Sequence, residues 1–120
     1  MILADTGIWA DHLRASESTL VELLTRGMIL MHWFVIGELA LGTLRDRDAT
    51  IAELSSLPRC VRVSDEAVIA AIDANQWMGQ GIGWVDATLL VSVRATSGAA
   101  LWTADRRLAM VARDLGVAVA

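Results

Sequence analysis

Short apolar runs alternate along the chain with segments whose apolar residues recur at helical spacing. Residues 20, 23 and 24 are leucines of one such segment, which ends at Gly27. Strands alternating with helices predict an α/β fold with a short, parallel-rich central sheet and helices on both faces. The expected strands are 2–4, 28–31, 61–63, 100–103 and 117–119. The expected helices follow Asp5, end at Gly27, hold Glu38, contain Ile51 and Leu54, start at Ser64 or Asp65, and span 84–96 and 105–115.

The chain of 120 residues predicts a single domain, 1–120, because no linker, repeat or low-complexity segment interrupts the pattern. Apolar residues make up 55% of it, and the mean hydropathy is +0.50. Both values are high for a small monomer. They predict that further surface is buried against a partner or a second copy of the chain.

A membrane span is not expected. The best candidate, 28–44, is shorter than the roughly 20 residues that a bilayer needs, and it carries His32 and Glu38. The first residues, MILAD, lack the basic region of a signal peptide. Cys60 is the single cysteine, so no internal disulfide or thiolate cluster is possible. A cytoplasmic protein is the simplest interpretation.

The charged residues exclude several kinds of chemistry. All ten basic residues are arginines, so Schiff-base chemistry and a P-loop lysine are both excluded. The fourteen acids give a net charge of −4, which argues weakly against a nucleic-acid-binding surface.

Four acids stand in unusual places. Asp5 and Asp105 each follow an expected strand, at the carboxyl end where parallel sheets bind ligands. Glu38 and Asp86 each lie in a helix that is otherwise apolar. Each acid also has a structural explanation: a helix cap for Asp5 or Asp105, an arginine pair or solvent exposure for Glu38, and the helix dipole for Asp86.

Taken together, the four acids predict a divalent cation. Carboxylates brought together repel one another and raise one another's pKa unless a cation holds them. Oxygen ligands without thiolates or paired histidines favour Mg²⁺ or Mn²⁺. On this interpretation Glu38 is retained because a divalent ion lies beside it, and the chemistry that suits such a site best is phosphodiester hydrolysis.

Four motifs resemble the successive signatures of PIN-domain ribonucleases, and the similarity is closest to the VapC-type toxins of bacterial toxin–antitoxin modules. These motifs are DTGIW at 5–9, GELALG at 37–42, GIGWVDATLL at 81–90 and LWTADRRL at 101–108. They run through nearly the whole chain in the family's order. The resemblance implies a PIN-like domain in which Asp5, Glu38, Asp86 and Asp105 bind Mg²⁺ or Mn²⁺ and are the catalytic residues. Thr103 occupies the family's hydroxyl position near this site.

The resemblance also implies an activity and partners. Members of the family cleave single-stranded regions of RNA, often tRNA or ribosomal RNA, by metal-assisted hydrolysis. They form homodimers, and a cognate antitoxin of the VapB type inhibits them by packing its C-terminal segment into a groove that leads to the site.

One position departs from the family. Gly7 stands where relatives often carry serine, so a hydroxyl that supports the metal or a phosphate is missing. Thr6 or Thr103 are the candidates to compensate for it. The alternatives are a non-catalytic PIN-like interaction protein and a PIN-like nuclease acting on DNA. A phosphatase using Asp5 as nucleophile is disfavoured, because the chain lacks a lysine.

Two further residue types are candidates for lesser roles. Of the two histidines, His32 lies at the end of an expected strand near the proposed site. The five tryptophans are expected to pack in the core or at a protein interface in most cases, with base stacking possible for one of them.

Overall fold

The computed structural model describes residues 1–119 and has a parallel sheet at its centre. Within these residues the sheet has three strands in the order β2-β1-β3, and β1 pairs in parallel with both neighbours. Leu3 lies opposite Leu30 on one side and Leu101 on the other. The predicted parallel sheet is therefore confirmed. The strands are β1 (Ile2–Ala4), β2 (Ile29–Leu30) and β3 (Ala100–Trp102).

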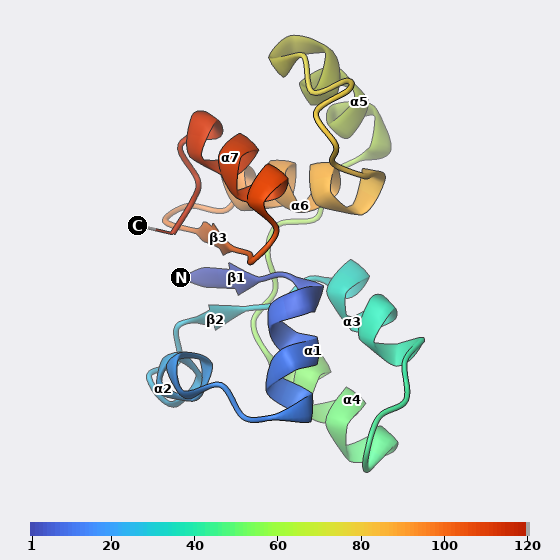
Figure 1. The fold of residues 1–120 in the computed structure, drawn as a ribbon, viewed down its shortest axis with the longest axis vertical. Helices are drawn as coiled ribbons and strands as arrows, with labels where there is room; N and C mark the ends of the chain where they lie inside the picture. The colour runs from blue at the N-terminus through green and yellow to red at the C-terminus, as the bar shows by residue number, and fades with distance from the viewer. Residues whose placement is uncertain (120) are drawn as a thin grey trace.

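Helices surround this sheet. In Figure 1, the N-terminal helices α1–α4 lie on the β2 side of the sheet and α5–α7 lie on the β3 side. The fold is therefore the predicted α/β, PIN-like arrangement. The helices of the described part are α1 (Thr6–Arg14), α2 (Ser18–Thr25), α3 (Trp33–Ala40), α4 (Arg47–Ser56), α5 (Asp65–Asn75), α6 (Trp84–Ala95) and α7 (Arg106–Leu115).

Two predicted strands are wrong. The segment 61–63 leaves the sheet after one isolated bridge between Met31 and Arg59, because the Val61 amide donates to the Thr96 hydroxyl rather than to a strand. The segment 117–119 forms only the bridge between Leu101 and Ala118. Neither segment forms a ladder: 61–63 lies outside the sheet, and 117–119 only extends it beside β3.

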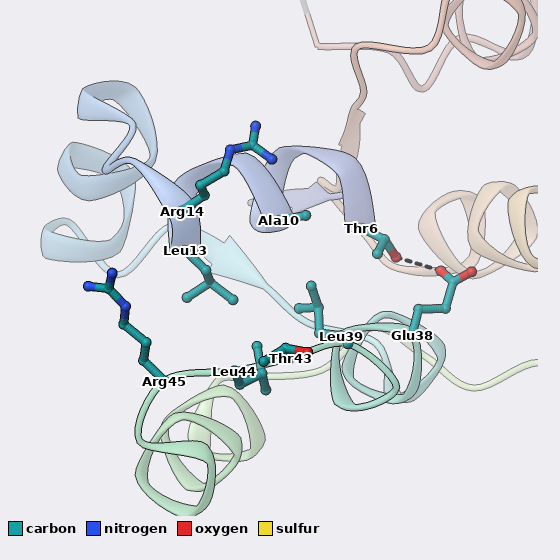
Figure 2. A pocket seen from close by; sticks show the side chains of 10 residues that line it. Thr6, Ala10, Leu13, Arg14, Glu38, Leu39, Thr43, Leu44 and Arg45 are labelled. Atoms are coloured by element: carbon teal, nitrogen blue, oxygen red, sulfur yellow. Dashed lines mark hydrogen bonds between the residues drawn. The ribbon is translucent and has the colours of Figure 1, made fainter.

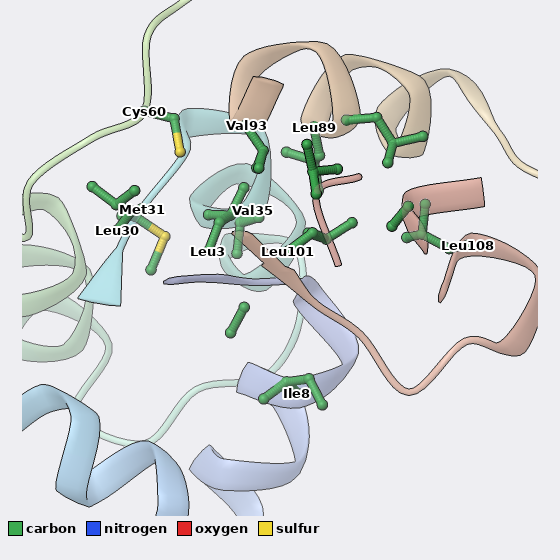
Figure 3. Close-up of a cluster of buried hydrophobic side chains, with 14 of the residues drawn as sticks. Leu3, Ile8, Leu30, Met31, Val35, Cys60, Leu89, Val93, Leu101 and Leu108 are labelled. Carbon is green, nitrogen blue, oxygen red and sulfur yellow. The ribbon is translucent and has the colours of Figure 1, made fainter. Parts of the chain in front are cut away.

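The core forms where the sheet meets the helices. Leu3 and Leu101 from adjacent strands pack with Val35 of α3 and with Leu89 and Val93 of α6 (Figure 3). In α6, every residue from position 87 to 93 is buried. A helical stretch enclosed in this way carries no charge on any side, which accounts for the run ATLLVSV, whose two polar residues are the small Thr88 and Ser92.

The apolar stretch 28–44 is not one helix. It divides into β2 and α3, and His32 lies between them as the N-cap of α3. Among the described residues, no helix has both the length and the apolar character needed to cross a bilayer.

Candidate metal and catalytic centre

The four predicted acids line one cavity of about 270 Å³. Asp5 follows β1 directly, and Asp105 follows the end of β3 by three residues, so the parallel pairing of these strands brings both acids to the same edge of the sheet. Glu38 comes from the last turns of α3 and Asp86 from the first turn of α6. The other residues that line the cavity are Thr6, Gly7, Leu89 and Ala104.

Asp5 and Asp105 are helix caps as well as cavity residues. The Asp5 carboxylate accepts the Ile8 amide at 3.3 Å as N-cap of α1. Asp105 caps α7 by accepting the amides of Arg107 at 2.9 Å and Leu108 at 3.1 Å. The capping explanation is thus correct for both residues. It leaves a second carboxylate oxygen on each that makes no cap bond, so capping and ligand binding are compatible.

Thr103 connects these two acids. Its hydroxyl donates a hydrogen bond to Oδ2 of Asp5, the oxygen that does not cap α1. The same hydroxyl accepts the backbone amide of Asp105 at 3.0 Å. Thr103 therefore fixes the orientation of the Asp5 carboxylate relative to the start of α7.

Glu38 is exposed to solvent, so the structural explanation by exposure holds for this residue. The buried residues of α3 are Val35, Ile36 and Leu39, which leaves Glu38 on the opposite face. Its Oε1 accepts a hydrogen bond from the Thr6 hydroxyl at 2.5 Å, drawn as a dashed line in Figure 2. Glu38 needs no cation to offset burial, and its case as a ligand rests on its place in the cavity.

Asp86 lies half-buried in the first turn of α6, where its Oδ2 accepts the Gly83 amide at 3.1 Å. This contact satisfies one of the free amides at the helix start and places the negative charge at the favourable end of the helix dipole. The dipole explanation therefore holds, and the carboxylate still faces the same cavity as Asp5.

The acids act on one another electrostatically. Burial raises the pKa of Asp5, the hydrogen bonds from Thr103 and from the Ile8 amide oppose this effect, and the charges of Asp86 and Asp105 raise the pKa further. Three carboxylates therefore share one electrostatic environment. This is the arrangement that a bound cation would relieve.

The donor set fits a hard divalent cation, although the carboxylates do not form a closed coordination sphere. Carboxylate and hydroxyl oxygens line the cavity, with neither thiolate nor imidazole among its lining residues. Within residues 1–119, no three acidic, histidine or cysteine side chains converge as metal ligands. Mg²⁺ keeps several of its waters and is often bound through only one or two carboxylates, so an open cavity suits it.

Other candidates from the sequence lie elsewhere. His32 is buried and is not among the residues lining the acidic cavity; its Nδ1 accepts the Phe34 amide at 2.9 Å as the cap of α3. Trp9 and Trp77 are buried, as expected for most of the tryptophans, whereas Trp33 and Trp84 are exposed.

Sequence reasoning missed two apolar walls of the cavity and one close contact beside it. Leu89 and Ala104 line the cavity, and both lie within the motifs already noted. The Arg107 side chain covers Gly81, where an added Cβ would lie 2.5 Å from Arg107 Cδ. Gly81 also has a φ of +80°, a backbone conformation that favours glycine. Both partners of this contact lie in motifs noted in the sequence: Gly81 opens the segment GIG before Asp86, and Arg107 is the second arginine after Asp105.

The fold has a parallel sheet flanked by helices, and four acids surround a cavity at the carboxyl ends of its strands. This is the architecture of a PIN-type nuclease domain. The chain is 42% identical over 120 residues to proteins named Ribonuclease VapC32 in two strains of Mycobacterium tuberculosis, CDC 1551 / Oshkosh and ATCC 25618 / H37Rv. Each alignment covers 100% of this chain and 97% of the relative. The chain belongs to the VapC family of PIN-domain ribonucleases. No protein-family model and no solved structure gave a significant match.

Proposed function

We propose that this chain is a metal-dependent endoribonuclease, the toxin of a toxin–antitoxin module, which hydrolyses phosphodiester bonds in structured RNA such as tRNA or rRNA. The observation that carries the proposal is the shared cavity of Asp5, Glu38, Asp86 and Asp105 in a chain of the VapC family.

The four acids would hold Mg²⁺ or Mn²⁺, directly or through its waters. When bound, such an ion supplies a water of lowered pKa and neutralises charge on the transferring phosphoryl group. The chain's own residues orient the carboxylates: Thr103 fixes Asp5, and Thr6 holds Glu38 across the gap between α1 and α3. Gly7 contributes no hydroxyl. Of the two threonines that could replace it, Thr6 lines the cavity and Thr103 does not, so Thr6 is the better candidate to support a phosphate.

The proposed partners are an RNA substrate, a cognate antitoxin of the VapB type and a second copy of the chain. An antitoxin that presents a basic side chain to the acidic cavity would replace the charge of the ion and block access. This mode of inhibition needs no change of fold in the toxin, because the cavity is open.

Cleavage of a mixed tRNA and rRNA pool by the purified chain tests the proposal. We expect cleavage with Mg²⁺ or Mn²⁺, and none with EDTA or in Asp86→Asn, because the substitution removes one ligand charge from the cavity. Asp73→Asn is the matched control, since Asp73 is exposed on α5 and does not line the cavity. A folded, metal-loaded protein that leaves every RNA intact would contradict the proposal. Cleavage of single-stranded DNA in place of RNA would redirect it to a DNA nuclease.

A further inference from the structure

A groove of about 410 Å³ adjoins the acidic cavity (Figure 2). One wall is a single face of α1, because its lining residues Thr6, Ala10, Leu13 and Arg14 follow at helical spacing. The other wall consists of the end of α3 and the loop before α4. Its residues are Glu38, Leu39, Gly42, Thr43, Leu44 and Arg45.

The groove shares two lining residues with the acidic cavity. Thr6 and Glu38 line both spaces, and their hydrogen bond marks the junction. From Thr6 to Arg14 the groove follows α1 for roughly 12 Å. Even at the compact spacing of a duplex strand, about 3.4 Å per nucleotide, this length holds only a short stretch of nucleotides.

Charge differs between the two ends of the groove. Acids lie at the cavity end, whereas Arg45 lies at the opposite end in Figure 2. Arg14 lines the groove from the last turn of α1, but its guanidinium is turned away from the groove in Figure 2 and pairs with Asp11. Arg14 pairs with Asp11 at 2.6 Å, but both side chains are largely exposed, so the pair is weak and leaves Arg14 free to exchange partners.

The loop that carries Arg45 is held in place. Arg47 donates to the Ala40 carbonyl at 2.6 Å and to the Gly42 carbonyl at 3.4 Å. These bonds tie the start of α4 to the end of α3 across the loop, so Arg45 projects from a backbone that is fixed at both ends. A fixed backbone lowers the entropy lost when the side chain binds a ligand.

We propose that this groove seats the single-stranded RNA segment that flanks the bond to be cleaved, with Arg14 and Arg45 contacting its phosphates. The inference rests on the proposed function and adds the path of the substrate. Arginine suits phosphate through its forked donors. The aliphatic side chains between the two ends, Leu13, Leu39 and Leu44, offer no hydrogen bonds to base edges. The groove therefore contributes affinity and direction rather than sequence selectivity.

The test is binding of a short, fluorescein-labelled, mixed-sequence single-stranded RNA in EDTA, followed by fluorescence anisotropy over a range of salt concentrations. Arg14→Ala/Arg45→Ala is the test variant. Arg26→Ala is the matched control, because Arg26 also pairs within its own helix, with Glu22, but does not line the groove. Circular dichroism confirms folding, and cleavage with Mn²⁺ is measured separately.

For the double variant we expect binding weakened about tenfold. We also expect the slope of log affinity against log salt to become shallower by about 1.4, at about 0.7 per phosphate contact on a single strand. Arg26→Ala should match the wild type in both. An unchanged affinity and slope in a double variant that still cleaves RNA would overturn the groove as RNA path and leave it as a seat for the antitoxin. Absence of both binding and cleavage in the wild type would instead contradict the proposed function.

Discussion

The hydroxyl of Thr103 is the one side-chain group described that touches both strand-end acids of the cavity, through Asp5 Oδ2 and the Asp105 amide. A hydrogen bond donated to a metal-binding carboxylate holds that carboxylate in the orientation that the metal needs. Asp5 is also the acid whose pKa burial raises, so the donated bond favours the charged form that binds cations.

Replacing Thr103 with valine removes the hydroxyl and keeps the shape of the side chain. We expect Mn²⁺ affinity to fall about 10- to 100-fold, since outer-shell partners of metal ligands have effects of this size. Isothermal titration with Mn²⁺ measures it. Thr25→Val is the control, because the Thr25 hydroxyl is exposed and donates only to the Val21 carbonyl of its own helix. Equal Mn²⁺ affinity in Thr103→Val and wild type would remove Thr103 from the site.

At this scale the sequence singled out four acids that line one cavity, but it left open whether Glu38 is buried or exposed. The run FVIGELALG is apolar on nearly every side of Glu38, so both solvent exposure and a positive partner stayed open as explanations. In α3 the buried face contains Val35, Ile36 and Leu39, and the exposed face contains Glu38 together with Leu41, which is 91% exposed. Hydrophobic pattern cannot show which face is buried when both faces are apolar.

At the scale of elements, helices begin and end where the sequence carries a glycine or a capping side chain. Gly27, Ser64 and Asp105 each ended or capped a helix as expected. The segments 61–63 and 117–119 have the composition of strands, but 61–63 forms no bridge and 117–119 forms a single isolated one. Whether a short apolar run joins a ladder depends on the partner that its amides meet, and for Val61 that partner is a threonine hydroxyl. The two residues are 35 positions apart, so the sequence around Val61 does not predict this contact.

His32 makes the start of α3, and hence the position of Glu38, sensitive to acid. Burial and the charge of Arg62 lower the pKa of His32 in the folded protein, and its neutral Nδ1 accepts the Phe34 amide. As pH falls through about 6.5, the unfolded chain binds a proton at His32 while the folded protein resists it. The free energy of unfolding therefore decreases until the pH reaches the lower, folded-state pKa.

Chemical denaturation at a series of pH values from neutral to mildly acidic measures this decrease. In His32→Asn, which keeps a side chain able to cap α3, we expect the decrease over this range to be smaller than in the wild type. His12→Asn is the matched control for removal of a histidine and should keep the wild-type decrease. If His32→Asn and wild type lost stability in parallel, the acid sensitivity would belong to another group.

On the scale of the whole molecule, the apolar surplus of the sequence remains visible on the surface. Large apolar side chains are exposed on several helices, among them Leu41, Ile69 and Met110. Exposed apolar area of this kind favours association, and a two-fold dimer is its commonest form. Sedimentation equilibrium should therefore give twice the mass of the chain. A monodisperse monomer over the micromolar range would contradict the dimer.

The overall architecture was predictable because parallel pairing places the ends of β1 and β3 at one edge of the sheet, so the acids after each strand meet. The groove beside the cavity was not predictable. Thr6 and Arg45 line the same space although 39 positions separate them in the sequence. Their meeting depends on how α1 packs against α3, which the pattern of single helices does not specify.

The most direct test of the account is Mn²⁺ binding by the wild type and by Glu38→Gln, measured by isothermal titration on matched, folded samples. We expect Mn²⁺ to bind the wild type and its affinity to fall at least tenfold in Glu38→Gln, because an exposed acid at the cavity has little structural reason to be indispensable unless it holds the ion. Equal affinity in the two proteins would contradict the four-acid site and leave Glu38 as the hydrogen-bond partner of Thr6 alone.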